Sequence, residues 1–236
     1  DKLEDKLDGK LPVNRLELLY LVNSWGRIDF FYTEYLNEDV TIVKCEPNYC
    51  YDLSKLDVSQ ITNMDSIFEH SNYSGDISKW NMSSVTDMSY MFYNTKEFNS
   101  NINDWDVSNV INMSAVFMNN KTFNQQLDKW NTSNVTSMDS MFYNSIFNQP
   151  IENWNLSNAL SMNSMFYRAE KFNQNISSWD ISNVTNMSYM FSNTSEFNQN
   201  ISNWNLNNVT NMESMFEYAI KFNQNISSWN TKNVTT

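Results

Sequence analysis

Tryptophan recurs along most of this chain at an almost constant interval. Seven tryptophans form the row Trp80, Trp105, Trp130, Trp154, Trp179, Trp204 and Trp229. Neighbouring members lie 25 residues apart, except Trp130 and Trp154, which lie 24 apart. A repeat of this length is typical of solenoids, in which each copy is one small structural unit and stacked copies bury a continuous core.

Two more rows keep the same period. An apolar pair recurs as Ile67-Phe68, Met91-Phe92, Val116-Phe117, Met141-Phe142, Met165-Phe166, Met190-Phe191 and Met215-Phe216. A Phe-Asn dipeptide follows each pair, at Phe98, Phe123, Phe147, Phe172, Phe197 and Phe222, with Tyr73 in this position in the first copy. The short interval arises because Ser145-Ile146 replaces a three-residue linker such as Thr95-Lys96-Glu97. The sequence therefore divides into a non-repeating segment, residues 1–55, and seven repeats over residues 56–236, of which the last is truncated.

Residues 172–195 serve as the type of one copy. Phe172 and Ile176 fit the alternation of a short strand, and Asn173 and Asn175 then face outward. In the second half of the copy, apolar residues are spaced as on one face of a short helix, at Val184, Met187, Met190 and Phe191. Asn193 suits the end of such a helix, because Asn tolerates the left-handed conformation. The sequence thus predicts an α/β repeat solenoid: a leucine-rich-repeat-like stack with one short strand and one short helix per 25-residue repeat.

Residues 1–55 do not follow the period. The apolar segment from Arg15 to Val22 predicts a helix with Asn14 as its N-cap, and Asp39 to Cys45 predicts a strand. A helix and a strand just before the first repeat predict an N-terminal α/β cap over the open end of the stack. Cys45 and Cys50 could close a small disulfide loop in an exported protein, and two free thiols fit the sequence nearly as well.

The charge balance bears on the partners of the chain. Acidic residues number 27 against 15 basic ones, which argues against nucleic acid or an anionic membrane surface as the main partner. No apolar run is long enough for a transmembrane segment, and no secretory signal is visible. Because the chain begins at Asp1 and stops partway through a repeat, we expect a trimmed fragment that lacks any signal or anchor.

No constellation of residues in the chain predicts catalysis. The single histidine, His70, would have to serve any Ser-His-Asp or Cys-His site, and no nucleophile-elbow motif surrounds any serine. Phosphate-binding loops, dinucleotide motifs and metal-spaced His or Cys clusters are missing as well. Asp57, Asp106 and Asp180 occupy a slot that holds Asn in the other copies, which indicates a turn requirement. The sequence predicts no catalytic residue, no cofactor and no metal site.

The tryptophan row has two interpretations. If exposed, it would form a series of stacking platforms for sugars, and if buried, it would form a structural spine of the core. Its presence in every copy favours the spine, because a binding site rarely needs all copies of a repeat. The methionine rows are interpreted in the same way, because Met fills irregular gaps in a core.

The repeat resembles a known family. Its motif, W-[DN]-[VIL]-S-N-V-T-N-M-S-x-M-F-x-N-x-x-x-F-N-Q-x-I, is similar to the BspA-like surface repeats, and residues 179–201 match it throughout. The repeats depart from it at Ile67, Val116, Ala159, Thr132 and Thr231. The family is related to leucine-rich repeats and is common in surface proteins of mycoplasmas and other host-associated bacteria. The resemblance implies an exported or cell-surface protein, attachment to host proteins in several members, and no catalytic residues.

These observations lead to one functional prediction and two alternatives. We predict a non-catalytic, extracellular or cell-surface binding module that adheres to a partner protein, for example a host extracellular protein. A carbohydrate-binding solenoid and a structural spacer are the alternatives. The concave face of a solenoid commonly binds partners, so the predicted binding face centres on the outward amides Asn173, Asn175, Asn198 and Asn200.

Overall fold

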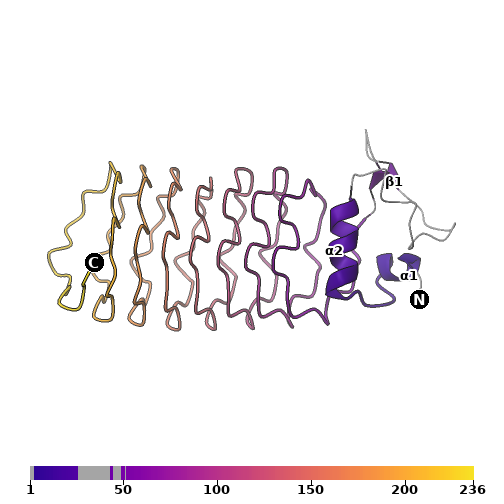
Figure 1. Cartoon of the computed structure of the whole chain (residues 1–236), viewed down its shortest axis with the longest axis horizontal. Helices are drawn as coiled ribbons and strands as arrows, with labels where there is room; N and C mark the ends of the chain where they lie inside the picture. Colours follow the sequence, from indigo (N-terminus) through magenta and orange to yellow (C-terminus); the bar gives the residue numbers. More distant parts are fainter. Residues whose placement is uncertain (1–2, 26–42, 45–48, 51) are drawn as a thin grey trace.

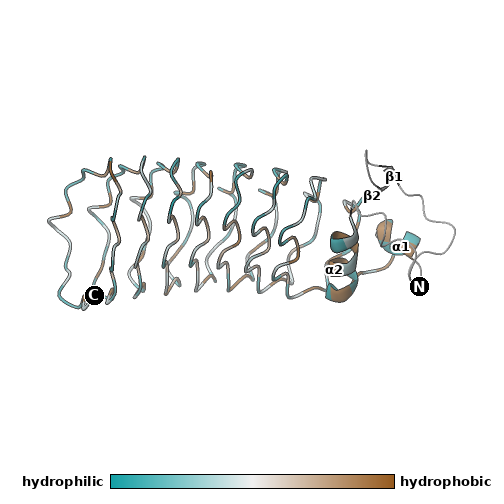
Figure 2. Ribbon diagram, turned by 45° about the horizontal axis from the view of Figure 1, so that its top comes forward, coloured by the Kyte–Doolittle hydropathy of each residue, from teal (hydrophilic) through white to brown (hydrophobic). Residues whose placement is uncertain are grey.

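Stacked coils make up most of the molecule. The computed structural model describes residues 3–25, 43–44, 49–50 and 52–236. The coils follow one another along a single axis, with the helices at the N-terminal end and the C-terminus at the opposite end (Figure 1). Figure 2 shows that hydrophilic and hydrophobic residues alternate within the coils, so each coil contributes both to the interior and to the surface.

The predicted α/β fold class is wrong. The described chain contains helices α1 (Leu3–Leu7) and α2 (Arg15–Ser24) and strands β1 (Val43–Lys44) and β2 (Tyr49–Cys50), and all four lie before the repeats. Residues 52–236 form turns and bends, with neither a helix nor a strand. Strand-like pairing between consecutive coils is limited to isolated parallel bridges, such as the one between Asn186 and Asn211. The repeats therefore form a solenoid of turns.

The segment predicted as helix is a run of tight turns. The N–H of Met190 donates to the carbonyl of Met187, three residues earlier, whereas an α-helix would bond four residues back. Between them Tyr189 has a φ of 57°, and Asn193 has a φ of 56° four residues later. A left-handed residue at the third position is a feature of type II turns. Successive turns of four residues bring Met187, Met190 and Phe191 inward as a helix would, which explains the misleading pattern.

Alternate N–H groups of this segment bind the next coil. The N–H groups of Met187, Tyr189, Phe191 and Asn193 donate to the carbonyls of Asn211, Glu213, Met215 and Glu217. We call this segment the ladder; it spans residues 63–71, 87–95, 112–120, 137–145, 161–169, 186–194 and 211–219. Because every such bond runs from one coil to the following coil, the groups that a helix would pair internally join neighbouring coils instead.

The segment predicted as strand also bonds differently. The N–H of Asn173 donates to the side-chain oxygen Oδ1 of Asn148, at 3.0 Å, and not to a backbone carbonyl. The N–H of Asn198 then binds Oδ1 of Asn173, again at 3.0 Å. Because side-chain amides take the place of backbone acceptors, the regular backbone hydrogen bonds of a β-sheet do not form here, and no strand develops.

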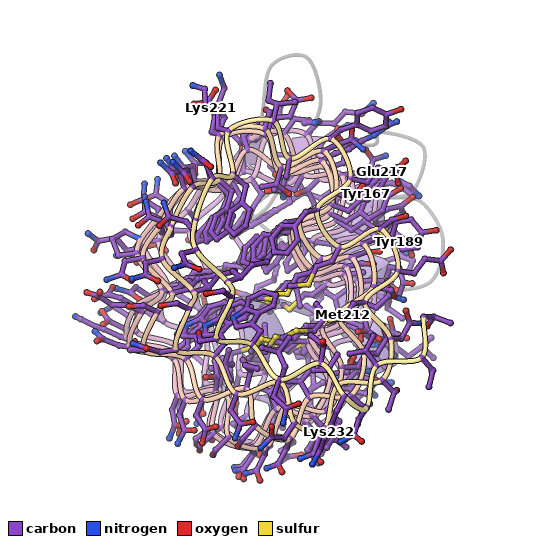
Figure 3. The ribbon with its side chains drawn as sticks, turned by 90° about the vertical axis from the view of Figure 1, so that its left-hand side faces the viewer. Tyr167, Tyr189, Met212, Glu217, Lys221 and Lys232 are labelled. Atoms are coloured by element: carbon purple, nitrogen blue, oxygen red, sulfur yellow. The ribbon has the colours of Figure 1, made fainter. Side chains whose placement is uncertain are left out.

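Aromatic rings fill the interior of the stack. Trp80, Trp105, Trp130, Trp154, Trp179 and Trp204 are buried, and Trp229 is partly buried. The rings of Trp154 and Trp179 lie parallel with centroids 6.4 Å apart, and the indole N–H of Trp179 donates to the carbonyl of Ile151 at 3.0 Å. Viewed along the stack, rings and methionine sulfurs occupy the centre of the coils (Figure 3). The tryptophan row is thus a core spine whose polar N–H groups are satisfied by the preceding coil.

Helix α2 closes the N-terminal end of the stack, as the sequence predicts for Arg15 to Val22. Asn14 caps it in a capping box with Glu17, and Leu18 and Leu21 are buried in the common core. The Arg15 guanidinium donates to the carbonyls of Asn63 at 3.0 Å and Asp65 at 2.7 Å. In later coils the equivalent carbonyls accept ladder N–H groups, so Arg15 replaces the donors of a preceding coil.

Part of the predicted cap lies outside the described residues. Strands β1 and β2 pair antiparallel, with Val43 opposite Cys50. The strand predicted from Asp39 to Cys45 overlaps the described chain only in β1, and the proposed pairing of Cys45 with Cys50 lies outside it. Neither of the two described helices has the length and apolar character needed to cross a membrane.

Candidate interaction surface

The four asparagines of the predicted binding face are exposed on adjacent coils, but their oxygens are engaged in the fold. Oδ1 of Asn173 accepts the N–H of Asn198 and also Nε2 of Gln199, at 2.9 Å. Oδ1 of Asn198 accepts the N–H of Asn223 in the same way, at 2.9 Å. The Phe-Asn-Gln sequence of the repeat therefore encodes a joint between coils, since its amides hold the next coil in register.

This joint runs along most of the stack. We call it the amide strip; its members are Asn99, Asn124, Asn148, Asn173, Asn198 and Asn223. Each member except the last accepts the N–H of the next one with its side-chain oxygen. Such a chain of bonds satisfies backbone donors that strand pairing would otherwise serve.

Asn175 and Asn200 serve the turns of their own coils. Each accepts the N–H of the serine two residues later, Ser177 and Ser202, at 3.0 Å. This bond is an Asx turn, in which a short carboxylate or amide mimics a backbone carbonyl. The side-chain oxygens of all four residues of the predicted face thus belong to the scaffold.

The slot that holds Asp or Asn after each tryptophan makes the same turn. Oδ1 of Asp106 accepts both the hydroxyl of Ser108 and its N–H, the latter at 3.0 Å. These hydrogen bonds, first the hydroxyl and then the N–H, lower the pKa of Asp106 below its usual value. Asn205 makes the equivalent bond to the N–H of Asn207, at 2.9 Å. The carboxylates of this slot are therefore turn formers.

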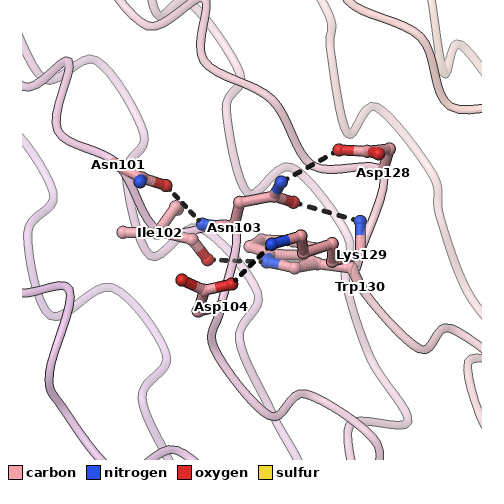
Figure 4. Close-up of polar contacts among 7 residues, drawn as sticks. All are labelled: Asn101, Ile102, Asn103, Asp104, Asp128, Lys129 and Trp130. Carbon is pink, nitrogen blue, oxygen red and sulfur yellow. Dashed lines mark hydrogen bonds and ion pairs between the residues drawn. The ribbon is translucent and has the colours of Figure 1, made fainter.

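Some joints between coils carry extra polar contacts. Buried Asn103 donates through Nδ2 to Asp128 and accepts the N–H of Lys129, at 2.9 and 3.1 Å (Figure 4). The Lys129 ammonium also pairs with Asp104 across the same joint, at 3.1 Å. Both polar atoms of the buried Asn103 side chain thus have partners within the fold.

A shallow groove crosses four coils on the side of the Ser-Asn-Val motif. It has a volume of about 810 Å³ and is lined by Ser83, Ser84, Thr86, Asn109, Ile111, Asn134, Thr136, Asn158 and Leu160. Nδ2 of Asn134 donates to the carbonyl of Ser108 at 2.6 Å, so this amide also joins two coils. Ile111 and Leu160 are exposed at 48% and 50%, in a slot that holds Thr in other coils. The groove carries no charged side chain.

The outward side of the ladder carries large side chains whose type changes from coil to coil. Six tyrosines lie there, and we call this surface the tyrosine face: Tyr90, Tyr93, Tyr143, Tyr167, Tyr189 and Tyr218. Tyr143 and Tyr167 stack with ring centroids 4.6 Å apart, and Tyr189 meets Tyr167 edge-on at 6.3 Å. Figure 3 shows Tyr167 and Tyr189 on the same side of the stack, together with Glu217. These rings are half-exposed or exposed and make no backbone joint between coils through their side chains.

Two polar contacts belong to the tyrosine face. The guanidinium carbon Cζ of Arg168 lies 5.5 Å from the ring centroid of Tyr167. The hydroxyl of Tyr189 donates to Oε1 of Glu213 at 3.1 Å, and this bond raises the pKa of Tyr189. The face therefore already combines aromatic rings with both a cation and a carboxylate.

His70, the single histidine, lies on this side as well. Its Nδ1 is 2.8 Å from Nδ2 of Asn94, and its ring meets Tyr93 edge-on at 5.1 Å. Its Nε2 lies 3.6 Å from Oε1 of Glu69. These neighbours include no serine or cysteine nucleophile. In the part of the chain that the structure describes, no group of three His, Cys, Asp or Glu residues could hold a metal ion.

Reasoning from the sequence missed the tyrosine face, although a signal for it was present. The slot after the Met-Phe pair holds Glu69, Tyr93, Met118, Tyr143, Tyr167, Ser192 and Glu217. The amide strip, by contrast, keeps Asn in each of its coils. A slot-by-slot comparison of the copies would have separated constant joints from variable surface. It would have directed the search to the second half of the repeat.

Comparison with known proteins finds one family. Residues 39–149 and 143–236 match the family described as "Mycoplasma protein of unknown function, DUF285". Neither a curated protein nor a solved structure matches the chain. Because the two matched regions together cover much more than half of the sequence and include all seven coils, this chain belongs to that family of mycoplasma proteins.

Proposed function

We propose that this chain is a non-catalytic binding module of an extracellular or cell-surface protein, and that its tyrosine face adheres to a partner protein. One observation carries the proposal: the tyrosines are grouped on an outward surface whose side chains vary between coils and whose joints between coils are made mainly by the backbone. The resemblance to BspA-like surface repeats supports the location and the adhesive role.

The chemistry of the face suits protein recognition. Tyrosine is enriched at protein interfaces, since its ring supplies a large apolar area and its hydroxyl a polar contact, with few rotatable bonds. From Tyr90 to Tyr189 the face crosses five successive ladders, which are joined by backbone hydrogen bonds. Such a rigid scaffold lowers the ordering cost of binding, because the rings are held in place before the partner arrives.

The carbohydrate alternative loses its first support. It relied on tryptophan rings as stacking platforms, and six of the seven rings are buried between neighbouring coils. Exposed tyrosines could still stack on sugars, so a glycan array belongs in the same experiment. A pure spacer would bind nothing in either assay. The acidic balance of the chain supports a partner other than nucleic acid.

The test is a binding screen of residues 1–236 against host extracellular proteins and a glycan array, followed by matched variants. The triple variant Tyr93→Ser, Tyr143→Ser, Tyr167→Ser introduces the residue that Ser192 already provides in the same slot. The control, Ile111→Thr with Leu160→Thr, introduces the residue found in that slot at Thr86 and Thr136. We expect the triple variant to lose at least about tenfold in affinity and the control to bind as wild type. Equal binding by both variants would refute the proposal.

A further inference from the structure

The acidic charge of the chain is not spread evenly over its surface. The outward slots of the ladders hold six carboxylates, namely Asp65, Glu69, Asp87, Asp139, Glu213 and Glu217. Against these, the same slots hold one arginine, Arg168, and the single histidine, His70. The groove on the Ser-Asn-Val side has no charged lining residue at all. The tyrosine face is thus aromatic and acidic at the same time.

Two acids outside the ladder form ion pairs with lysines. Lys129 pairs with Asp104 at 3.1 Å and Lys221 with Glu196 at 2.7 Å, and both pairs join neighbouring coils. Among the described residues, Glu69 is the one ladder carboxylate with an ionic contact, and its neighbour is His70, at 3.6 Å. The other five ladder carboxylates have no ion pair among the described residues, and Arg168 is the single arginine or lysine in the ladder slots, so the ladder carries a net negative charge.

The hydrogen bonds of these carboxylates leave room for a further partner. Oδ1 of Asp87 accepts the N–H and the hydroxyl of Ser89, in an Asx turn. Oδ1 of Asp139 accepts the N–H of Asn163 in the next coil. In both residues one oxygen atom serves the fold, and a carboxylate has a second oxygen that can accept from a cation.

The tyrosine face already contains one example of the chemistry that such a partner would use. The Arg168 guanidinium lies over the ring of Tyr167, in the arrangement of a cation–π contact. Tyr90 and Tyr93 lie in the coil of Asp87, and Tyr143 lies in the coil of Asp139. A cation bound there would meet an aromatic ring and a carboxylate together.

We propose that the tyrosine face binds a positively charged, Lys- and Arg-rich segment of its partner protein. This inference rests on the proposed function, because it names the chemistry of the partner at the same face. Aromatic rings and unpaired carboxylates complement ammonium and guanidinium groups, and the charge complementarity also speeds encounter with the partner. Binding of this kind weakens as salt screens the charges.

The test uses fluorescence anisotropy with two labelled probes, a short peptide of alternating Lys and Ser and a matched peptide of alternating Glu and Ser. We expect residues 1–236 to bind the Lys peptide at low salt and not to bind the Glu peptide. Raising the ionic strength to about 0.15 M should weaken the binding, because the Debye length falls to about 8 Å. Failure to bind the Lys peptide in preference to the Glu peptide would overturn the inference.

Two variants with the same net charge locate the site. The ladder variant combines Asp87→Asn, Asp139→Asn, Glu213→Gln and Glu217→Gln. Asn is already the residue of the first two slots at Asn112 and Asn163, so the turns persist. The control combines Glu97→Gln, Asp104→Asn, Glu152→Gln and Glu170→Gln, which are exposed outside the ladder.

The ladder variant should lose at least about tenfold in affinity for the Lys peptide, and the control should lose little. Equal losses of affinity in the two variants would mean that net charge alone governs binding, and would refute the ladder as the binding site. Circular dichroism of each variant verifies the fold. If the Lys peptide fails while the triple tyrosine variant still abolishes binding of a screened partner, the cationic inference falls and the proposed function stands.

Discussion

The amide strip and the tyrosine face lie on the same coils, yet they are built by opposite rules. In the amide strip each side-chain oxygen accepts a backbone N–H of the next coil, and the residue is Asn in all six coils. On the tyrosine face the backbone makes the joints, so the outward side chains are free to change from Tyr to Met, Ser or Glu. The difference teaches that constancy across the copies marks a joint, and that variation marks the surface available for recognition.

The largest loss of stability should come from a substitution in the buried tryptophan row. Trp179→Ala removes a ring stacked between Trp154 and Trp204 and also its indole hydrogen bond. We expect a loss of about 3–5 kcal/mol in the free energy of unfolding, measured by urea denaturation. Trp229→Ala is the matched control, because that ring is only partly buried and should cost clearly less. Equal losses would mean that stacking on both sides contributes nothing.

A smaller loss should follow from breaking the amide strip. Asn173→Ala removes the acceptor of the Asn198 N–H and should lower the free energy of unfolding by about 1 kcal/mol. Asn173→Asp keeps an oxygen at that place and should stay near wild type at neutral pH. Thermal or urea unfolding of the two variants makes the comparison. If both substitutions cost the same, the oxygen is not what joins the coils.

On the tyrosine face, a substitution should change binding of the partner much more than it changes the stability of the fold. Tyr167→Ser removes a half-exposed ring stacked on Tyr143, so its cost to stability should be only about 0.5 kcal/mol. The same slot already holds serine at Ser192. Urea denaturation measures the stability, and affinity for the screened partner measures the function. A stability loss as large as that of Trp179→Ala would place Tyr167 in the scaffold and erase the contrast between the two surfaces.

The smallest expected effect is on the loss of folding stability at acidic pH. The folded pKa of Asp106 is depressed, so its contribution to stability is present at neutral pH and is lost as the pH falls below 3.8 through the depressed value. Asp106→Asn keeps the acceptor, as Asn205 does in the same slot. We therefore expect a slightly weaker loss of stability in acid for Asp106→Asn than for wild type, seen in urea melts at neutral and acidic pH. A steeper acid loss in the variant would contradict the assigned cause.

Much of the architecture follows from the sequence, and the failures have physical causes. The period, the stacking of copies and the helix after Asn14 can be seen directly in the spacing of Trp, Phe and Asn. The helix predicted in each copy is absent, because an apolar spacing of three residues fits successive turns as well as a helix. The predicted strand is absent because the sequence does not show that the oxygen of Asn148 would take the N–H of Asn173.

The candidate site was harder to predict than the fold. Outward position alone selected Asn173 and Asn175, and the sequence gives no sign that their oxygens are already bonded. The ladder segment was predicted to be a helix in each copy. A separate helix in each copy gives no indication that Tyr167 and Tyr189, which belong to different copies, lie on one surface. Only the turns, with left-handed Tyr189 and Arg168, bring these side chains together on one surface.

The short linker of the fourth copy shows how such a protein can change in length. There the hydroxyl of Ser145 accepts the N–H of Phe147, and Ser71 does the same for Tyr73 in the other short linker, both at 3.0 Å. Phe142 and Phe147 still stack at 4.2 Å, so losing a residue leaves the neighbouring copies undisturbed. Because copies with long and short linkers stack through the same kinds of joint, the stack tolerates a change of length within a copy. The number and order of tyrosine-bearing units can therefore change while the joints between coils stay the same.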